Sequence, residues 1–339
     1  DGIRDDLVTG VQTCALPISL VYNKTYDSQK EFDMRRSIYE ENLQFITHHN
    51  SNYEENGFTF TLGINEHMDL LNEEFKLKKN FKFNKQNKSM NLIKTPKLFK
   101  TFKKMKINNL DRNEKDIPQS IDWREHDAVN PIKNQGQCGS CWAFSTTGSV
   151  ESMWAIFRGR LLSLSEQQLM DCSKKEGDMS CNGGLMDYAF QYYLDMGGAC
   201  LEEEYPYQEK DRDMCELCTK IVHIDGFKDI EPNNEKELMK QVAIQPVSVA
   251  LDAGSIYWQF YRSGIFNHPY ACGYNLDHGV VVIGYGTENG QDYWIVRNSW
   301  GKYFGEEGYI RLARNVDDKR GMCGIAMQPS YPFVKSNII

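Results

Sequence analysis

The first 19 residues of this 339-residue chain lack an apolar run long enough for a secretory signal peptide or a membrane span. Asp1, Asp5 and Asp6 stand where a signal peptide would carry positive charge. We interpret residues 1–19 as a non-native leader joined to the chain at about Leu20. Cys14 therefore enters no disulfide prediction, and we predict no membrane partner.

Acidic residues are missing between Glu74 and Asp111, whereas residues 76–106 contain twelve lysines. The formal charge is −2 for residues 1–19, +4 for residues 20–116 (18 basic, 14 acidic) and −10 for residues 117–339 (20 basic, 30 acidic). A basic segment is a candidate for nucleic-acid binding. Because the same chain supplies an acidic partner, we instead predict a contact between the two segments and no nucleic acid.

Compact zinc-ligand spacing is also missing. Nine of the ten cysteines lie at or after residue 138, which indicates disulfides and an oxidising compartment. Two pairs have C-x-x-C spacing, Cys138 with Cys141 and Cys215 with Cys218, but their first cysteines lie 77 residues apart, too far for a zinc ribbon. No short βαβ unit surrounds Cys138 and Cys141, so a thioredoxin-like redox pair is disfavoured. We predict neither a metal nor another cofactor.

A possible nucleophile lies in residues 134–145, NQGQCGSCWAFS. After Cys141, apolar residues follow at helical spacing until Gly159, so Cys141 is expected at a helix N-terminus, where backbone N–H groups favour a thiolate. Such a cysteine needs a base, a group that orients the base, and donors for an oxyanion. Candidates occur later, at residues 277–279 (DHG) and 293–301 (YWIVRNSWG).

The order and spacing of these motifs resemble a papain-family cysteine protease, of the cathepsin L-like branch that includes many plant vacuolar enzymes. His278 and Asn298 follow Cys141 by 137 and 157 residues, close to a known signature of that family. The resemblance implies that Cys141 is the nucleophile, His278 the base and Asn298 its orienting partner. It also implies an oxyanion hole formed by the Gln135 side chain and the Cys141 N–H, and a Trp300 ring that covers the histidine.

The same resemblance implies a substrate cleft. Its predicted residues are Gly183, Gly184, Leu185, Met186, Ala250, Leu276, Asp277, Trp300 and, at the floor of the S2 pocket, Gln328. The S2 residues other than Gln328 are apolar, so we predict Leu, Phe or Val at P2. Simple core packing is the less favoured explanation of these residues. No paired histidines mark an occluding loop, which favours an endopeptidase.

Residues 20–116 resemble the inhibitory pro-segment of cathepsin L-like zymogens, rich in helix. Glu31, Arg35, Tyr39, Asn42, Ile46 and Asn50 fall at steps of 4, 4, 3, 4 and 4, which puts them on one side of a helix. Gly63, Asn65 and Asp69 match a second motif, but His67 replaces the usual Phe, and we favour a solvated ring there. Residues 76–106 are expected to run through the cleft and then to form a cleavable linker. Asn23 and Asn87 begin glycosylation sequons.

Residues 117–339 are expected to form the mature enzyme after cleavage near Asp116. A helix is predicted after Leu164, with Ser165 and Gln168 as a capping box. Apolar β-branched runs at 246–251, 279–285 and 308–312 predict strands. Helices followed by strands indicate an α+β fold of two subdomains. By resemblance the disulfides are Cys138–Cys181, Cys172–Cys215 and Cys272–Cys323, with Cys200 and Cys218 either a fourth bridge or spare thiols.

We therefore expect a secreted, lysosomal or vacuolar cysteine endopeptidase that acts through a thioacyl-enzyme and is made as an autoinhibited zymogen. Expected partners are protein and peptide substrates, its own pro-segment and cystatin-type inhibitors, and the enzyme is expected to be a monomer. Two other interpretations stay open: an inhibitor that acts through the pro-segment, and an inactive homologue. Cys141 argues against the second, since Ser or Gly would mark lost activity.

Overall fold

The computed structural model describes residue 22, residues 24–78 and residues 117–335. The predicted leader, the sequons at Asn23 and Asn87, the cleavage site near Asp116 and nearly all of the lysine-rich segment lie outside the described residues. Within the described residues, no helix is long and apolar enough to cross a membrane.

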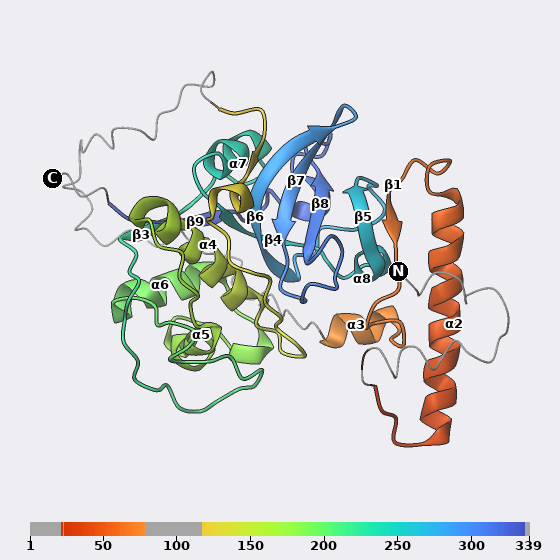
Figure 1. Ribbon diagram of the computed structural model, residues 1–339, viewed down its shortest axis with the longest axis horizontal. Helices are drawn as coiled ribbons and strands as arrows, with labels where there is room; N and C mark the ends of the chain where they lie inside the picture. The colour runs from red at the N-terminus through yellow and green to blue at the C-terminus, as the bar shows by residue number, and fades with distance from the viewer. Residues whose placement is uncertain (1–21, 23, 79–116, 336–339) are drawn as a thin grey trace.

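The C-terminal part, residues 117–335, has a helical side and a sheet side, as predicted (Figure 1). The helical side contains α4 (Cys141–Arg158), α5 (Glu166–Cys172), η4 (Ser173–Lys175), η5 (Ser180–Asn182) and α6 (Met186–Met196). The sheet side contains β2 (Ile121–Asp122), η3 (Trp123–His126), β3 (Gly226–Asp229), α7 (Glu235–Val242), β4 (Val247–Leu251), α8 (Ile256–Phe260), β5 (Tyr261–Phe266), β6 (His278–Glu288), β7 (Gln291–Arg297), β8 (Tyr309–Ala313), η6 (Met322–Gly324) and β9 (Ser330–Phe333).

The strands form one mixed, mainly antiparallel sheet in the order β1-β5-β8-β7-β6-β4-β9-β3, with β2 paired to β6. Helix α4 packs across β6 and β4. Ser145 Oγ donates to Val280 O at 2.7 Å, and Ser248 Oγ donates to Ser145 O at 3.0 Å. A Cβ at Gly148 would lie 2.8 Å from Arg297 Nη1 and 3.1 Å from Val281 Cγ2, so a larger residue there would require these side chains to move.

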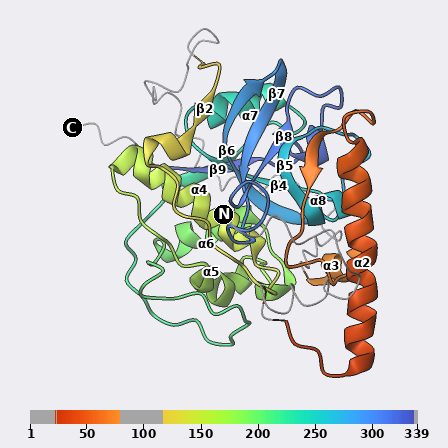
Figure 2. The same ribbon diagram turned by 45° about the vertical axis from the view of Figure 1, so that its right-hand side comes forward.

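The N-terminal part consists of α2 (Gln29–Asn52), β1 (Thr59–Leu62) and α3 (Asn72–Lys78). Both views show α2 standing beside the sheet edge formed by β1 and β5, on the side away from α4, α5 and α6 (Figure 2). Strand β1 pairs with β5, with Thr59 opposite Ile265 and Thr61 opposite Ser263. The N-terminal part thus extends the sheet of the C-terminal part by one strand.

The polar residues predicted on one side of α2 hold the segment that follows the helix. Arg35 Nη1 contacts Glu74 Oε2 at 2.7 Å, and Asn42 Nδ2 donates to the carbonyl oxygens of Met68 and Leu70. Asn50 both accepts from Leu62 N and donates to Leu62 O. These side chains satisfy backbone groups of a segment with little regular structure, which explains their spacing along the helix.

The predicted solvation of His67 is wrong. Its side chain is only 5% exposed, and its ring packs 5.1 Å from Phe75 and 6.4 Å from Trp300, measured between ring centroids. His67 Nε2 lies 3.6 Å from Glu66 Oε1. The ring therefore takes an aromatic place in the contact between the two parts of the chain, as the usual phenylalanine would.

The capping box predicted for α5 is half formed. Ser165 Oγ accepts from Gln168 N at 3.0 Å, as expected. The Gln168 side chain does not return to the Ser165 N–H, because its Oε1 accepts from Cys200 N at 2.8 Å. The Ser165 N–H instead donates to Cys200 O. A tertiary contact has replaced the local one.

Four disulfides cross-link the described residues. They join Cys138 to Cys181, Cys172 to Cys215, Cys200 to Cys218 and Cys272 to Cys323. The first, second and last are the bridges expected by resemblance, and the third answers the question left open for Cys200 and Cys218. Cys141 is the free cysteine of the described residues, and it is buried.

Candidate active site

Cys141 is the first residue of α4, as the periodicity predicted. The start of β6 lies directly against it, since a Cβ at Gly279 would be 3.3 Å from Trp142 N and Cα. The thiol is fully buried, which raises the pKa of Cys141 to about 12, although backbone hydrogen bonds from Gly279 and Trp142 favour the thiolate. Burial of Cys141 thus favours the protonated thiol over the thiolate.

His278 supplies a base at the first residue of β6, beside Gly279. Its Nε2 lies 2.7 Å from Asn298 Oδ1, which also accepts from Ser299 N at 2.8 Å. The Ser299 N–H identifies that atom of Asn298 as the carbonyl oxygen, so His278 Nε2 carries the hydrogen of the neutral ring. Nδ1 is left as the ring nitrogen that can accept a proton.

Trp300 stacks on the histidine ring. The two ring centroids are 4.6 Å apart at an interplanar angle of 28°, and Trp300 is buried. Phe304 supports the indole edge to face at 5.0 Å, although the family usually has Trp at that position. The hydrogen bond between His278 and Asn298 is thereby covered by an apolar wall.

The loop that carries Gln135 is held against the loop that carries Asn298. Gln135 N donates to Ser299 O at 2.8 Å, and Gln135 Oε1 accepts from Ser299 Oγ at 2.6 Å. One hydrogen of Gln135 Nε2 goes to Cys138 O at 2.9 Å, which leaves the second for another acceptor. Glu209, which sequence reasoning missed, accepts from Gln137 N at 2.5 Å.

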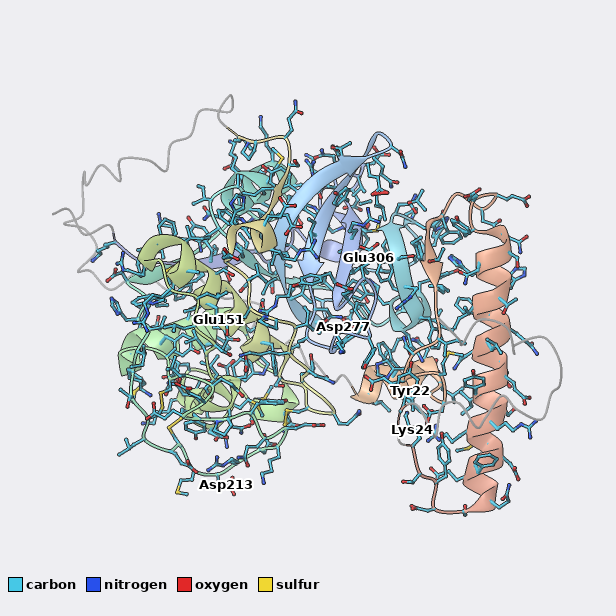
Figure 3. The ribbon with its side chains drawn as sticks, in the orientation of Figure 1. Tyr22, Lys24, Glu151, Asp213, Asp277 and Glu306 are labelled. Carbon is cyan, nitrogen blue, oxygen red and sulfur yellow. A yellow bond between two sulfur atoms is a disulfide. The ribbon has the colours of Figure 1, made fainter. Side chains whose placement is uncertain are left out.

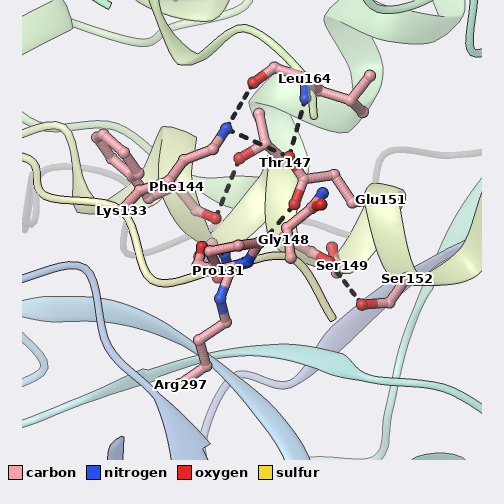
Figure 4. A network of polar contacts seen from close by, with 12 residues as sticks. Pro131, Lys133, Phe144, Thr147, Gly148, Ser149, Glu151, Ser152, Leu164 and Arg297 are labelled. Atoms are coloured by element: carbon pink, nitrogen blue, oxygen red, sulfur yellow. Dashed lines mark hydrogen bonds and ion pairs between the residues drawn. The ribbon is translucent and has the colours of Figure 1, made fainter. Parts of the chain in front are cut away.

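A buried network of charges lies behind these two loops (Figure 4). Lys133 Nζ contacts Glu151 Oε1 at 3.3 Å and Glu166 Oε1 at 2.7 Å. Arg297 Nη1 lies 3.6 Å from Glu151 Oε2. Burial raises the pKa of Glu166 to about 7. Lys133 is two residues from Gln135, and Arg297 adjoins Asn298. Because Glu151 contacts both Lys133 and Arg297, it links the loop that carries Gln135 to the loop that carries Asn298.

The predicted cleft wall contains two glycines, Gly183 and Gly184, that the sequence analysis named. It also depends on Asp178, which the sequence analysis did not name. Gly183 has a φ of 106°. A Cβ at Gly184 would lie 2.4 Å from Asp178 Oδ1 and 2.6 Å from Trp142 Cδ2. Asp178 Oδ1 accepts from Leu185 N at 2.8 Å. Burial raises the pKa of Asp178 to about 8. No local pattern marks this aspartate, because its partners come from the folded loop.

The apolar residues predicted for the S2 pocket come together. Met186, Ala250 and Leu276 are buried in one cluster, with Leu185 packed against it. Met327, which the sequence analysis missed, also packs against this cluster, and its apolar type next to Gln328 was the available signal. Gln328 itself is exposed, so its predicted place at the pocket floor stays a prediction.

Asp277 precedes the histidine and borders a cavity of about 690 Å³. Its Oδ1 accepts from Ala253 N at 2.7 Å. Burial, together with the charge of Asp252, raises the pKa of Asp277 to about 7. Across the described residues, no group of three or more His, Cys, Asp or Glu side chains is placed to hold a metal ion.

The described residues thus contain a buried cysteine at the start of α4 and a histidine–asparagine hydrogen bond at the start of β6, within an α+β fold of two parts. These are groups that thiol-dependent hydrolases use. Residues 117–333 match the family described as papain family cysteine protease, and residues 20–75 match the cathepsin propeptide inhibitor domain (I29). The chain belongs to the papain family of cysteine proteases and carries the propeptide domain of its zymogens.

Individual relatives agree with this assignment. The chain is 45% identical over 313 residues to the oryzain beta chain of Oryza sativa subsp. japonica, a match that covers 89% of this chain and 62% of that protein. Digestive procathepsin L 3 of Tenebrio molitor larval midgut has a TM-score of 0.81 at 38% identity, covering 96% of this chain and 100% of that one. Recombinant stem bromelain precursor has a TM-score of 0.80 at 36% identity, covering 94% and 97%.

Proposed function

We propose that this chain is the precursor of a cysteine endopeptidase that hydrolyses peptide bonds through Cys141, His278 and Asn298. Residues 20–116 would be the inhibitory pro-segment and residues 117–339 the peptidase domain. The observation that carries the proposal is the pair of contacts around His278. Asn298 Oδ1 accepts the Nε2 hydrogen, and Gly279, the next residue of β6, lies against Trp142 near the N-terminus of α4.

The geometry supports a two-stage reaction. His278 Nδ1 takes the proton of Cys141, and the thiolate attacks the carbonyl carbon of the substrate. Gln135 Nε2 and the Cys141 N–H would bind the resulting oxyanion. The imidazolium then gives its proton to the leaving amine, the C–N bond breaks and a thioacyl-enzyme remains. Water, deprotonated by His278, hydrolyses that thioester and frees Cys141.

The cleft supports a hydrophobic residue at P2, because Met186, Ala250 and Leu276 form one buried apolar surface. Gly184 lets Asp178 and Trp142 pack closely against this wall, and we propose that a peptide backbone approaches the wall at Gly183. We propose peptide and protein substrates, and inhibition by the chain's own pro-segment and by cystatin-type proteins. A vacuolar, lysosomal or secreted enzyme would suit the four disulfides, which form in oxidising compartments.

The proposal is tested with the fluorogenic peptide Z-Phe-Arg at pH 5, after acid activation of the purified precursor. We expect hydrolysis by the wild type, and a loss of at least about 10³-fold in kcat for Cys141→Ala, because the nucleophile is gone. An epoxide inhibitor of thiol proteases should abolish the wild-type activity by alkylating the same sulfur.

Cys141→Ala replaces a buried side chain with a smaller one, so its processing to the mature size by added wild-type enzyme serves as the folding control. A folded, fully processed wild-type chain with no activity would reject the enzyme and favour a protein that inhibits through its pro-segment. Active-site titration of the activated chain separates the two, since an inhibitor has no titratable thiol site.

A further inference from the structure

The cavity beside His278 is not the one that holds the predicted P2 residue. It is lined by His278, Trp300 and residues 252–255, but by none of the residues 183–186 that form the opposite wall. His278 is the residue that would protonate the leaving amine. The cavity therefore faces the part of a substrate that follows the scissile bond.

Two carboxylates border this cavity, and backbone amides hold both of them in place. Asp252 accepts from Gly254 N at 3.3 Å and from Asn275 N at 3.0 Å, and Asp277 accepts from Ala253 N. The two carboxylates act on each other, because the charge of Asp252 contributes to the raised pKa of Asp277. A cation placed between them would relieve this repulsion.

In the precursor a lysine already lines this cavity. Lys76, in α3 of the N-terminal part, lines the same cavity and is the cation that acts on Asp277. A Cβ at Gly254 would lie 2.7 Å from Asp277 Oδ2 and 3.3 Å from Lys76 Cε. The Asp277 and Lys76 side chains therefore both lie against the same face of Gly254. Figure 3 shows Asp277 at the end of the sheet that faces α3.

We propose that this cavity is a subsite for a cationic side chain of the substrate, on the leaving-group side of the scissile bond, and that Lys76 occupies it in the precursor. The proposal rests on the proposed peptidase function. Asp252 and Asp277 are its specificity-determining residues, and lysine or arginine is the class of side chain they select. Removal of the pro-segment takes Lys76 away and leaves the two carboxylates for a substrate.

The test uses the activated enzyme and internally quenched peptides with a common sequence up to P1, including Leu at P2. Lys, norleucine or Glu is placed in turn at P1′, P2′ and P3′. The value of kcat/KM is measured at pH 8, above the raised pKa of Asp277, in low salt and in about 0.5 M NaCl. At one of these positions we expect Lys to exceed norleucine by about three- to tenfold and Glu to be the poorest. High salt should shrink both ratios, because the selection is electrostatic.

Asp252→Asn should lower the ratio of Lys to norleucine toward one, and Asp317→Asn is the matched control. Asp317 is exposed and does not line the cavity, so the same loss of charge there should keep the wild-type ratio. Equal cleavage of Lys and norleucine peptides at all three positions by the wild type would overturn the subsite while leaving the peptidase intact. Cleavage of none of the peptides would overturn the proposed function, and this inference with it.

Discussion

Asp178 shapes the cleft wall without a place in the proposed chemistry. Its carboxyl accepts from Leu185 N and lies 2.7 Å from Ser173 Oγ, which is also 2.7 Å from Leu169 O. The Ser173 hydroxyl has one hydrogen, but it lies within hydrogen-bond distance of two acceptors, Leu169 O and the Asp178 carboxyl. Both hydrogen bonds can form if Asp178 carries a proton and donates it to Ser173 Oγ. Its pKa, raised by burial from 3.8 to about 8, agrees with a neutral carboxyl at acidic pH.

This arrangement predicts the behaviour of Asp178→Asn. In the wild type, the protonated carboxyl contributes stability that is fully present below pH 3.8 and lost as the pH rises through about 8. An amide keeps a donor and an acceptor but does not titrate. Between pH 5 and 9, we expect the free energy of unfolding to fall less for the variant, by on the order of 5 kcal/mol.

Urea unfolding of the mature enzyme, blocked with the epoxide inhibitor, measures this difference. Asp213→Asn is the control, because Asp213 is exposed and its loss of charge should leave the wild-type pH dependence in place. An Asp178→Asn curve parallel to the wild type would show that Asp178 is ionised throughout.

At the scale of elements, α2 and β1 dock on the sheet through an aromatic contact that contains histidines. His49 of α2 is 6% exposed, with its Nε2 3.0 Å from Phe60 O and its ring centroid 5.7 Å from Tyr257. His268 stacks on Phe58 at 4.1 Å. Burial lowers the pKa of both histidines, so the docked form favours neutral rings.

Acid should therefore loosen the N-terminal part. The stability that His49 adds to the docked state is fully present above its ordinary pKa of 6.5 and is lost as the pH falls through the lower docked value. His49→Gln keeps a donor for Phe60 O but cannot become charged. We expect the rate of acid activation of the His49→Gln precursor to depend less steeply on pH than that of the wild type. The midpoint of its rate–pH curve should lie at a lower pH.

The measurement is the rate of precursor processing between pH 3.5 and 6.5, followed by gel and by peptide hydrolysis. His48→Gln is the matched control, since His48 is exposed and adjacent on the same helix. The same midpoint and slope for His49→Gln and the wild type would mean that other groups carry the acid response.

At the scale of the whole molecule, acid has opposite effects on the two parts. Buried carboxyl groups make the peptidase part more stable at low pH, whereas the histidines make docking of the N-terminal part less stable. Burial raises the pKa of Asp187 to about 6, of Glu166 and Asp277 to about 7, and of Asp178 to about 8. Each contributes stability that is fully present at low pH and lost as the pH rises through its raised pKa. Acid thus favours release of the N-terminal part and preserves the peptidase part.

We predict that the thermal midpoint of the blocked mature enzyme is highest near pH 4 to 5 and falls by several degrees toward pH 8. A loss of about 1 kcal/mol shifts the midpoint of a domain of this size by roughly 2–4 °C. Differential scanning calorimetry at a fixed ionic strength measures it. A midpoint that rises between pH 5 and 8 would contradict the assignment of these carboxyl groups as neutral in the folded enzyme.

Local features of the fold could be predicted because their cause lies within a few residues. The helical spacing after Cys141 placed the cysteine at the start of α4, and the β-branched run after His278 predicted β6. The steps along α2 predicted its polar face. The grouping of Cys141, His278 and Asn298 came from resemblance, since their separation in sequence contains no information on distance in space.

The features that the sequence did not reveal all depend on contacts between distant segments. His67 is buried because Phe75 and Trp300 close around it, and Gln168 turns away from its own helix because Cys200 N reaches it. Burial in the folded loop raises the pKa of Asp178, although the Leu185 N–H that donates to its carboxyl favours the ionised form.

By itself, then, the sequence determined the helix that begins at Cys141 and the strands β4, β6 and β8, because the residue patterns that indicate them lie within a few consecutive residues. Only the tertiary structure decided the burial of Asp178 and the pairing of Cys200 with Cys218. It also decided the approach of Lys76 to Asp277. Burial and long-range charge exist only once the chain has folded, and they set these properties.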